Sequence, residues 1–231
     1  MKRFYTQVDL GEADSGWCVR LDGKPMRTPS KALLRLPNAR LAMALAQEWA
    51  GQGETIKADE MRLTRLATTV IDLMPTRRGD ALAEASDYGG NDLLCYRAER
   101  PDDLVARQQE TWQPWLDWLE RRHGIALAVT TGVRAMDQDA QARAALYDLV
   151  ATYDDWRLVG LHGLTTALGS LVLALAAAEG ALGADAAVDA SLLDEHYSRE
   201  RWGEDREALR REAHLRADVV AAVHYLNLLS A

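Results

Sequence analysis

Residues 21–29 read Leu-Asp-Gly-Lys-Pro-Met-Arg-Thr-Pro, and they decide how the N-terminal part of the chain folds. A tight primed turn needs positive φ at its central residues, so an Asp-Gly pair between apolar residues is a strong hairpin signal. Asp22 and Gly23 therefore predict a hairpin, with Gly23 as a structural turn residue. Short β-like runs, split by turn residues, surround this pair at residues 4–8, 17–21, 25–28 and 33–36. The first forty residues are thus predicted to form a curled antiparallel sheet.

After the β-like runs, apolar residues recur at the three- and four-residue spacing of helices. A first helix is predicted from Asn38 to Gly51, and a second from Met61 to Leu73, where Pro75 stops it. Further helices are predicted at residues 77–88, 101–124, 137–150, 154–178, 185–201 and 206–229. The predicted fold class is α+β. It consists of a small β-rich N-terminal domain over residues 1–75, followed by a larger all-α helical domain over residues 76–231.

Charge is distributed unevenly along the 231 residues. The whole chain has a net charge of −8, but residues 1–90 carry 13 Lys and Arg against 12 Asp and Glu, a net +1. Residues 91–231 carry 14 Arg against 23 Asp and Glu, a net −9. Domains that bind nucleic acid carry a basic patch or stripe, so we expect no nucleic-acid partner. The apolar content of 48% is typical of a globular protein.

The cysteines and the first residues predict a reduced compartment. Cys18 and Cys95 stand between apolar or aromatic neighbours, which is typical of buried thiols rather than of a disulfide scaffold or a zinc site. The chain opens on Met-Lys-Arg-Phe-Tyr, with neither the apolar core of a signal peptide nor an Arg- and Ser-rich transit peptide. We therefore expect a bacterial-type cytoplasmic protein. The expected oligomeric state is a monomer.

Residues 156–178 are apolar over a length that could cross a bilayer. Arg157, His162 and Ser170 interrupt the stretch, and no cluster of Lys and Arg flanks it to set an orientation. A central core helix is the prediction, and contact with a membrane is the alternative. No membrane span is expected.

Motifs for nucleotide, metal and nucleophilic chemistry are missing from the sequence. A phosphate-binding loop needs a Gly, four residues and then Gly-Lys-Ser/Thr; here Pro25 holds the hydroxyl position and Cys18 the position of the first Gly. The five histidines never pair at three- or four-residue spacing, as a metal site on a helix would require. We expect no cofactor, no metal and no catalytic residue. The alternative is a small-molecule enzyme of unknown type that uses surface carboxylates, such as Glu204 with Asp194.

Five motifs stand in order along most of the chain. They are Lys-Arg-Phe-Tyr at residues 2–5, the hairpin at residues 21–29, Gln-Glu-Trp-Ala at residues 47–50, Met-Arg-Leu-Thr-Arg-Leu-Ala at residues 61–67 and Asp-Leu-Leu-Cys-Tyr-Arg at residues 92–97. In this order they resemble the ATP synthase assembly chaperone family, in the branch that binds the α subunit of the F1-ATPase head. The resemblance implies a chaperone, not an enzyme, with the free ATP synthase α subunit as its partner. Such a chaperone shields the β-facing surface of the α subunit until the β subunit replaces it.

A further motif, Arg-Trp-Gly-Glu-Asp at residues 201–205, breaks a helical stretch near the C-terminus. Gly203 costs about 1 kcal/mol inside a helix, which favours a bend or a restart. Glu204 and Asp205 then fall in the first turn of the last helix, where carboxylates suit the helix dipole. A charged helix start is one interpretation. The resemblance implies another, in which Glu204 contacts the partner, with Trp202 and Asp205 beside it.

The resemblance also implies a structural role for Trp49, which would lock a helix to the sheet. The sequence departs from the usual pattern of the family at residues 195–199, which leaves contacts there open. Trp112, Trp115 and Trp118 recur every three residues within one predicted helix. These tryptophans fit a core face, and an interface with a partner is the alternative, since interface anchors are enriched in Trp.

Overall fold

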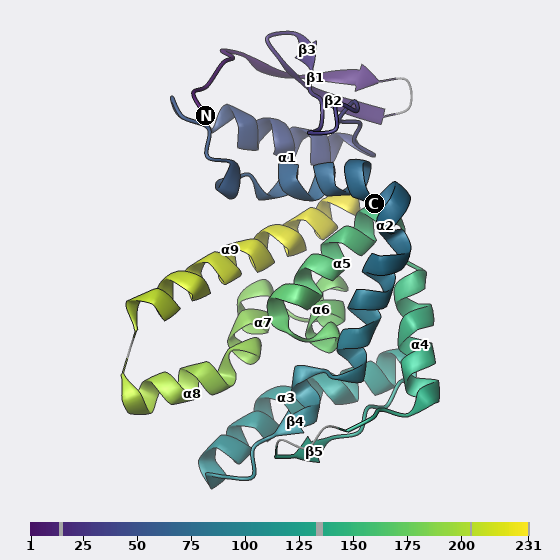
Figure 1. Cartoon of the computed structure of the whole chain (residues 1–231), viewed down its shortest axis with the longest axis vertical. Coiled ribbons are helices and arrows are strands. Elements are labelled where there is room, and N and C mark those ends of the chain that lie inside the picture. Colours follow the sequence, from purple (N-terminus) through teal and green to yellow (C-terminus); the bar gives the residue numbers. More distant parts are fainter. Residues whose placement is uncertain (14–15, 133–135, 204, 231) are drawn as a thin grey trace.

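The computed structural model describes residues 1–13, 16–132, 136–203 and 205–230 (Figure 1). The strands are β1 (Val8–Ala13), β2 (Gly16–Leu21), β3 (Lys24–Pro25), β4 (Tyr96–Arg97) and β5 (Thr130–Thr131). The helices are α1 (Ala39–Ala50), α2 (Arg62–Gly90), α3 (Asp102–His123), α4 (Ala140–Ala151), α5 (Asp155–Leu168), α6 (Leu171–Ala178), α7 (Ala184–Ser191), α8 (Leu193–Trp202) and α9 (Arg206–Leu229). Two short 3-10 turns, η1 (Ala58–Glu60) and η2 (Leu93–Cys95), complete the described elements.

The N-terminal sheet is antiparallel, in the order β1-β2-β3. β2 turns into β3 through Asp22 and Gly23, whose φ angles are +48° and +78°. The predicted primed turn is therefore confirmed. The Asp22 carboxylate accepts hydrogen bonds from the backbone N–H of Gln7 at 2.8 Å and of Thr6 at 3.0 Å. These two bonds lower the pKa of Asp22 and tie the turn to the segment that leads into β1.

Helix α1 lies across one face of this sheet (Figure 1). Asn38 begins the helix by accepting the N–H of Leu41 at 2.8 Å, and Gly51 ends it, as the spacing predicts. Leu41 and Leu45 are fully buried. The small sheet with α1 is followed by a larger helical part, so the predicted α+β class is confirmed. The sequence does not predict β4 and β5, which form a short parallel pair inside the helical part.

Helix α2 runs without a break from Arg62 to Gly90, so the prediction that Pro75 stops it is wrong. Pro75 removes one N–H from the helix ladder, which costs about 3 kcal/mol in a helix interior. Burial of Val70 and Met74 before it and of Leu82 after it outweighs this cost. The two helices predicted on either side of Pro75 are therefore one. The division into two domains at this position stays a prediction, and α2 passes through the boundary.

The prediction of one helix at residues 154–178 is also wrong, because this stretch forms two helices, α5 and α6. Gly169 adopts the left-handed conformation, with φ at +64°, and Ser170 then caps α6 by accepting the N–H of Leu173 at 3.0 Å. Both helices lie within the helical bundle, and α6 is almost wholly buried. Over the described residues, none of the helices combines the length and the apolar character needed to cross a membrane.

The helix predicted at residues 185–201 is likewise two helices, α7 and α8, which separate at Leu192. The hydroxyl of Ser191 donates to the carbonyl of Val188 at 2.9 Å, just before the break. Such bonds compete with the helix ladder and bend helices. The last helix, α9, has the bounds that the apolar spacing predicts.

Asp92 is a fully buried carboxylate at the N-terminus of α6. Its Oδ1 accepts the Ser170 hydroxyl at 2.7 Å and the N–H of Leu94 at 3.1 Å, and its Oδ2 accepts the N–H of Val172 at 3.1 Å. The carboxylate thus satisfies N–H groups that have no partner within their own helix. Burial nevertheless raises the pKa of Asp92 to about 6, because the charged form loses its hydration.

This raised pKa contributes a pH dependence to stability. Between about pH 4 and 6 the folded protein holds the proton that the unfolded chain has released, so rising pH lowers the free energy of unfolding, by about 3 kcal/mol in total, of which about 2 kcal/mol is lost between about pH 4.5 and 7. Above this window the carboxyl is ionised in both states and the contribution stays constant. Asp92→Asn is expected to remove this contribution, and Ser170→Ala, its control, to keep the titrating carboxyl. Urea unfolding at pH 4.5 and 7 measures it, and an unchanged pH dependence in Asp92→Asn would contradict the assignment.

Candidate partner-binding site

Two of the three predicted partner-binding residues, Trp202 and Asp205, lie at the tip where α8 ends and α9 begins. Trp202 is the last residue of α8, and Gly203 follows with φ at +91°. Asp205 is the N-cap of α9 rather than a first-turn residue, and its carboxylate accepts the N–H of Glu207 at 3.1 Å. Glu204, the residue expected to contact the partner, lies outside the described residues. The structure therefore brings Trp202 and Asp205 to the same tip.

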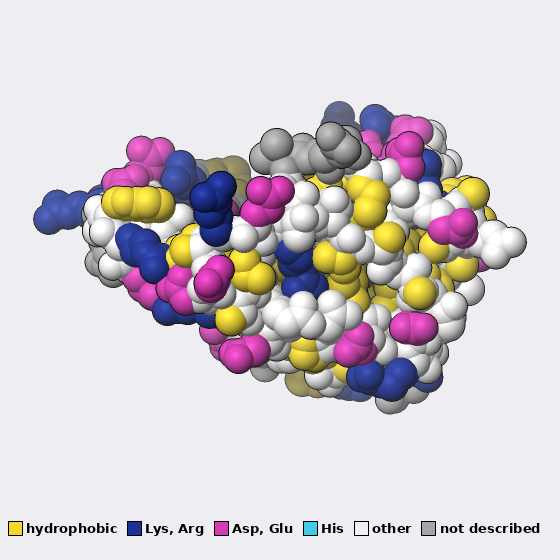
Figure 2. Space-filling model, turned by 90° about the horizontal axis from the view of Figure 1, so that it is seen from below, with side chains coloured by type: hydrophobic (Ala, Val, Ile, Leu, Met, Phe, Trp, Pro, Cys, Tyr) yellow, Lys and Arg dark blue, Asp and Glu magenta, His cyan; other side chains and the backbone are white. Residues whose placement is uncertain are grey.

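The side chain of Trp202 is open to solvent. The residue is 80% exposed, the highest value for a large apolar side chain among the described residues. Tryptophan offers a large apolar area and a polar N–H, and it is enriched among residues that dominate binding energy. At the end of the molecule that carries α8, on the left in Figure 2, apolar side chains are interleaved with basic and acidic ones. The tip thus has the composition of a small apolar anchor with a charged rim.

A cluster around Tyr197 holds α8 against α3. The Tyr197 hydroxyl donates to Oδ1 of Asp103 at 2.8 Å, and the guanidinium groups of Arg201 and Arg107 lie 4.0 and 5.3 Å from the ring centroid. Arg201 also pairs with Asp103, and Arg107 pairs with Glu200, each at 2.8 Å. Cation–π contacts and charge-assisted hydrogen bonds therefore act together here. They fix the base of the helix that presents the exposed tip.

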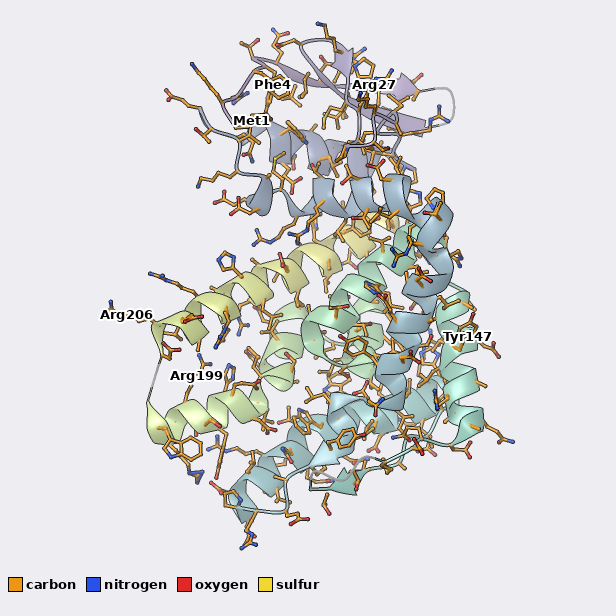
Figure 3. The ribbon with its side chains drawn as sticks, viewed as in Figure 1. Met1, Phe4, Arg27, Tyr147, Arg199 and Arg206 are labelled. Atoms are coloured by element: carbon orange, nitrogen blue, oxygen red, sulfur yellow. The ribbon has the colours of Figure 1, made fainter. Side chains whose placement is uncertain are left out.

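A polar seam centred on Glu212 spans the space between α8 and α9, where Arg199 lies (Figure 3). Oε2 of Glu212 accepts from Arg199 at 2.5 Å, Oε1 accepts from Arg216 at 3.1 Å, and Nε2 of His196 is 3.3 Å from Oε1. Burial alone would raise the pKa of Glu212, but the hydrogen bonds from the two arginines outweigh it and hold the pKa below its ordinary value. Arg216 extends the seam to Asp189 of α7 at 2.7 Å. Charged groups, rather than packed apolar ones, hold this part of α9 to α8.

Two clefts flank the seam. One has a volume of about 580 Å³ and is lined by residues of the seam and by Glu200, Leu209 and Ala213. The other has a volume of about 780 Å³ and is lined by residues that include Asp194, Ser198 and Leu215. A carboxylate with a lowered pKa, such as Glu212 at the centre, is a poor proton donor near neutral pH. The clefts therefore suit recognition of a charged protein surface better than acid catalysis.

The acid pair considered for a small-molecule enzyme cannot be assembled from the described residues, because Glu204 lies outside them. Its other member, Asp194, accepts a hydrogen bond from Nε2 of Gln108 at 2.8 Å. Within the described ranges, no group of three or more His, Cys, Asp or Glu side chains is placed to hold a metal ion. Cys18 and Cys95 are buried free thiols, and burial raises the pKa of Cys95 to about 12, which keeps it protonated and unreactive.

The two residues with predicted structural roles lie in the N-terminal unit, away from the tip (Figure 1). Gly23 is in the hairpin turn. Trp49 donates its indole N–H to Oγ1 of Thr64 at 3.0 Å, and its carbonyl accepts the Tyr5 hydroxyl at 2.7 Å. Trp49 thus joins α1 to the N-terminal segment and to the start of α2. The sequence predicts a largely buried ring, whereas the structure leaves Trp49 half-buried, with part of it facing a groove.

The tryptophans of α3 pack into the core of the helical part. Trp112 is fully buried and donates its indole N–H to the carbonyl of Ala190 at 2.7 Å. Trp115 and Trp118 are half-buried and packed against the same core. The core interpretation is therefore confirmed, and the contacts of these residues do not support an interface on this face.

Comparison with known proteins gives a consistent result. The family model described as ATP12 chaperone protein matches residues 2–120. The crystal structure of Atp12 from Paracoccus denitrificans is similar with a TM-score of 0.94 at 38% identity, covering 99% of this chain and 98% of that chain. The Atu1473 protein from Agrobacterium tumefaciens gives a TM-score of 0.95 at 38% identity, covering 99% of this chain and 86% of that chain. Protein atp12, mitochondrial, of Schizosaccharomyces pombe is 21% identical over 214 residues, which are 87% of this chain and 72% of that protein. The chain therefore belongs to the ATP12 chaperone family, the ATP synthase assembly chaperones that its sequence motifs resemble.

Proposed function

We propose that this chaperone binds the free α subunit of ATP synthase and shields its β-facing surface until the β subunit replaces it. The family supports a role in assembly. The observation that carries the proposal for a binding surface is the exposure of Trp202 at a tip whose base is fixed by the Tyr197 cluster. The Tyr197 cluster fixes the helix that carries Trp202, so little conformational freedom is lost when the exposed indole is buried by a partner. Burial of the indole therefore favours the complex.

The task sets physical limits on such a surface. An unassembled subunit exposes apolar area that later faces its neighbour, and this area drives aggregation. The chaperone must cover it with modest affinity, so that the true partner can compete. A single exposed tryptophan with a charged rim meets this need better than a wide apolar face. Neither nucleotide hydrolysis nor a cofactor is required, and their absence stays a prediction, as do the cytoplasmic location and the monomeric state.

Each predicted residue has a proposed role in this complex. Trp202 is the apolar anchor. Asp205 holds the first turn of α9 and offers its second carboxylate oxygen to the partner. Glu204 contributes a carboxylate beside it, as the resemblance implies. Gly23 and Trp49 keep the N-terminal unit in shape and are proposed to act through structure alone.

An aggregation assay tests the proposal. The purified chain is expected to suppress light scattering by isolated ATP synthase α subunit at near-equimolar ratio, without added ATP. Addition of the β subunit should release the chaperone, because both cover the same surface. An absolute requirement for ATP would contradict the proposal, as would equal protection of an unrelated aggregation-prone protein.

A further inference from the structure

A groove of about 890 Å³ opens between the N-terminal sheet unit and the start of α2. This volume is within the range of ligand sites in proteins, about 300–1,000 Å³. Its apolar wall includes Phe4, Tyr5, Met26, Trp49, Ile56 and Met61. The tip formed by α8 and α9 lies at a different end of the molecule, as the labels of Phe4, Arg27, Arg199 and Arg206 show in Figure 3.

Phe4 is the most informative side chain of the groove. It is the only phenylalanine in the 231-residue sequence, and it is 63% exposed rather than part of the core. Its ring meets the Tyr5 ring edge-on, with centroids 5.4 Å apart. Apolar surface gathered at a groove in this way marks a site that a partner covers.

The charge of the groove is opposite to that of the whole molecule. Among the described residues that line it, Lys24, Arg27 and Arg65 are cationic and exposed, and Asp22 is the one anion. Arg65 is paired with Asp218 at 3.1 Å, so the positive charge offered to an occupant comes chiefly from Lys24 and Arg27. The Asp22 carboxylate is already engaged by N–H groups of the segment that leads into β1. Arg27 donates one hydrogen bond, to the carbonyl of Lys31 at 2.8 Å, which leaves its charge uncompensated by that contact. An occupant with a carboxylate would be complementary to this basic rim.

The walls of the groove are held in place by hydrogen bonds from three segments. Oε1 of Glu48 accepts the N–H of Leu63 at 2.9 Å, and Oε2 accepts both the N–H and the hydroxyl of Thr64, at 2.9 and 2.6 Å. Trp49 donates to the same hydroxyl at 3.0 Å and accepts from Tyr5 at 2.7 Å. The groove is thus preformed, and little order has to be created when it is filled.

We propose that this groove binds an extended segment of the client protein that carries apolar side chains and at least one Asp or Glu. The client is the α subunit of ATP synthase, and its identity rests on the proposed function. With the α8–α9 tip as the other contact, the client is held at two separated sites. Two weak contacts made by one chain give useful affinity, yet each releases rapidly when a competitor displaces the other.

Photo-crosslinking in the full chain tests the groove. A benzophenone-bearing phenylalanine at position 4 is expected to crosslink to isolated α subunit. The same group at position 147, where Tyr147 is 44% exposed on α4, is the control and is expected not to crosslink. Mass spectrometry of the crosslinked α-subunit peptide should find apolar residues next to an Asp or Glu. Crosslinks to a second copy of the chain, to a co-purified lipid or to no partner would overturn the proposal.

The basic rim is tested with a synthetic copy of that crosslinked peptide. The double variant K24E/R27E is expected to bind it about tenfold more weakly at low salt, and the difference should shrink at high salt. A peptide with its Asp and Glu replaced by Asn and Gln should bind the two proteins equally. Equal binding of the acidic peptide to both would overturn the proposal. If the wild-type chain protects the α subunit while the groove results fail, only the groove proposal falls; if the wild-type chain gives no protection, the proposed function falls.

Discussion

Replacing Trp202 with alanine is expected to remove protection of the α subunit while the chaperone stays folded. An interface anchor contributes at least about 2 kcal/mol, so the variant should bind the α subunit about 30-fold more weakly. Because Trp202 is 80% exposed in the free chain, its removal breaks few contacts and should leave the melting temperature almost unchanged. Binding is measured by titration of labelled α subunit, and folding by circular dichroism and thermal unfolding.

A matched control is available elsewhere on the surface. Tyr147→Ala removes another exposed aromatic side chain, on α4, and should leave both binding and stability as in the wild type. If Trp202→Ala protects the client as well as Tyr147→Ala does, Trp202 is not an anchor and the tip is not the binding surface.

Substitutions of the two acidic residues that follow Trp202 in the sequence distinguish a helix cap from a partner contact. Asp205→Asn keeps an oxygen that can accept the N–H of Glu207, whereas Asp205→Ala loses this cap at a cost of about 1 kcal/mol. A partner contact therefore shows as lost protection in the Asn variant at unchanged stability. Glu204→Lys should likewise lose protection, with Glu207→Lys as the control one turn further on. Similar behaviour of the two reversals would leave Glu204 without a specific role.

Local signals predicted those parts of the fold that depend on a few neighbouring residues. The turn at Gly23, the start of α1 at Asn38 and the whole of α9 follow from backbone conformation, capping and spacing. The errors have two different causes. Burial along α2 is tertiary packing that outweighs the break that Pro75 would cause. The break after α7 goes with a local bond, from the hydroxyl of Ser191 to the carbonyl of Val188, at a place where the apolar spacing continues.

The candidate site was only partly predictable for the same reason. The break at Gly203 marks the tip in the sequence, and the exposed Trp202 stands next to it. The cluster that fixes the tip joins Tyr197 to Asp103, which lie 94 positions apart, and no local pattern predicts such a pair. Within the seam, only the pair Glu212 and Arg216, at four-residue spacing, carries a signal that sequence reasoning could have used.

The start of α2 is capped by Glu48, the residue before Trp49, and no local sequence pattern predicts this cap. Met61, the N-cap of α2, makes no side-chain capping bond. Glu48, from the end of α1, instead accepts the N–H groups of Leu63 and Thr64. The helix therefore takes its cap from a residue 15 positions away. Trp49 lies at the centre of this junction, so the stability of the N-terminal unit depends on it.

Trp49→Arg is therefore expected to destabilise the protein by about 3–4 kcal/mol. The substitution removes the ring that lies 5.6 Å from the Tyr5 ring and the hydrogen bond to Thr64. It also places a second cation close to Arg3, whose guanidinium lies 4.5 Å from the centroid of the Tyr5 ring. For a chain of this length, the melting temperature should fall by about 6–16 °C. Trp202→Arg, the same exchange at an exposed site, should leave it within about 2 °C. A Trp49→Arg variant that melts with the wild type would show that this junction does not hold α1 to α2.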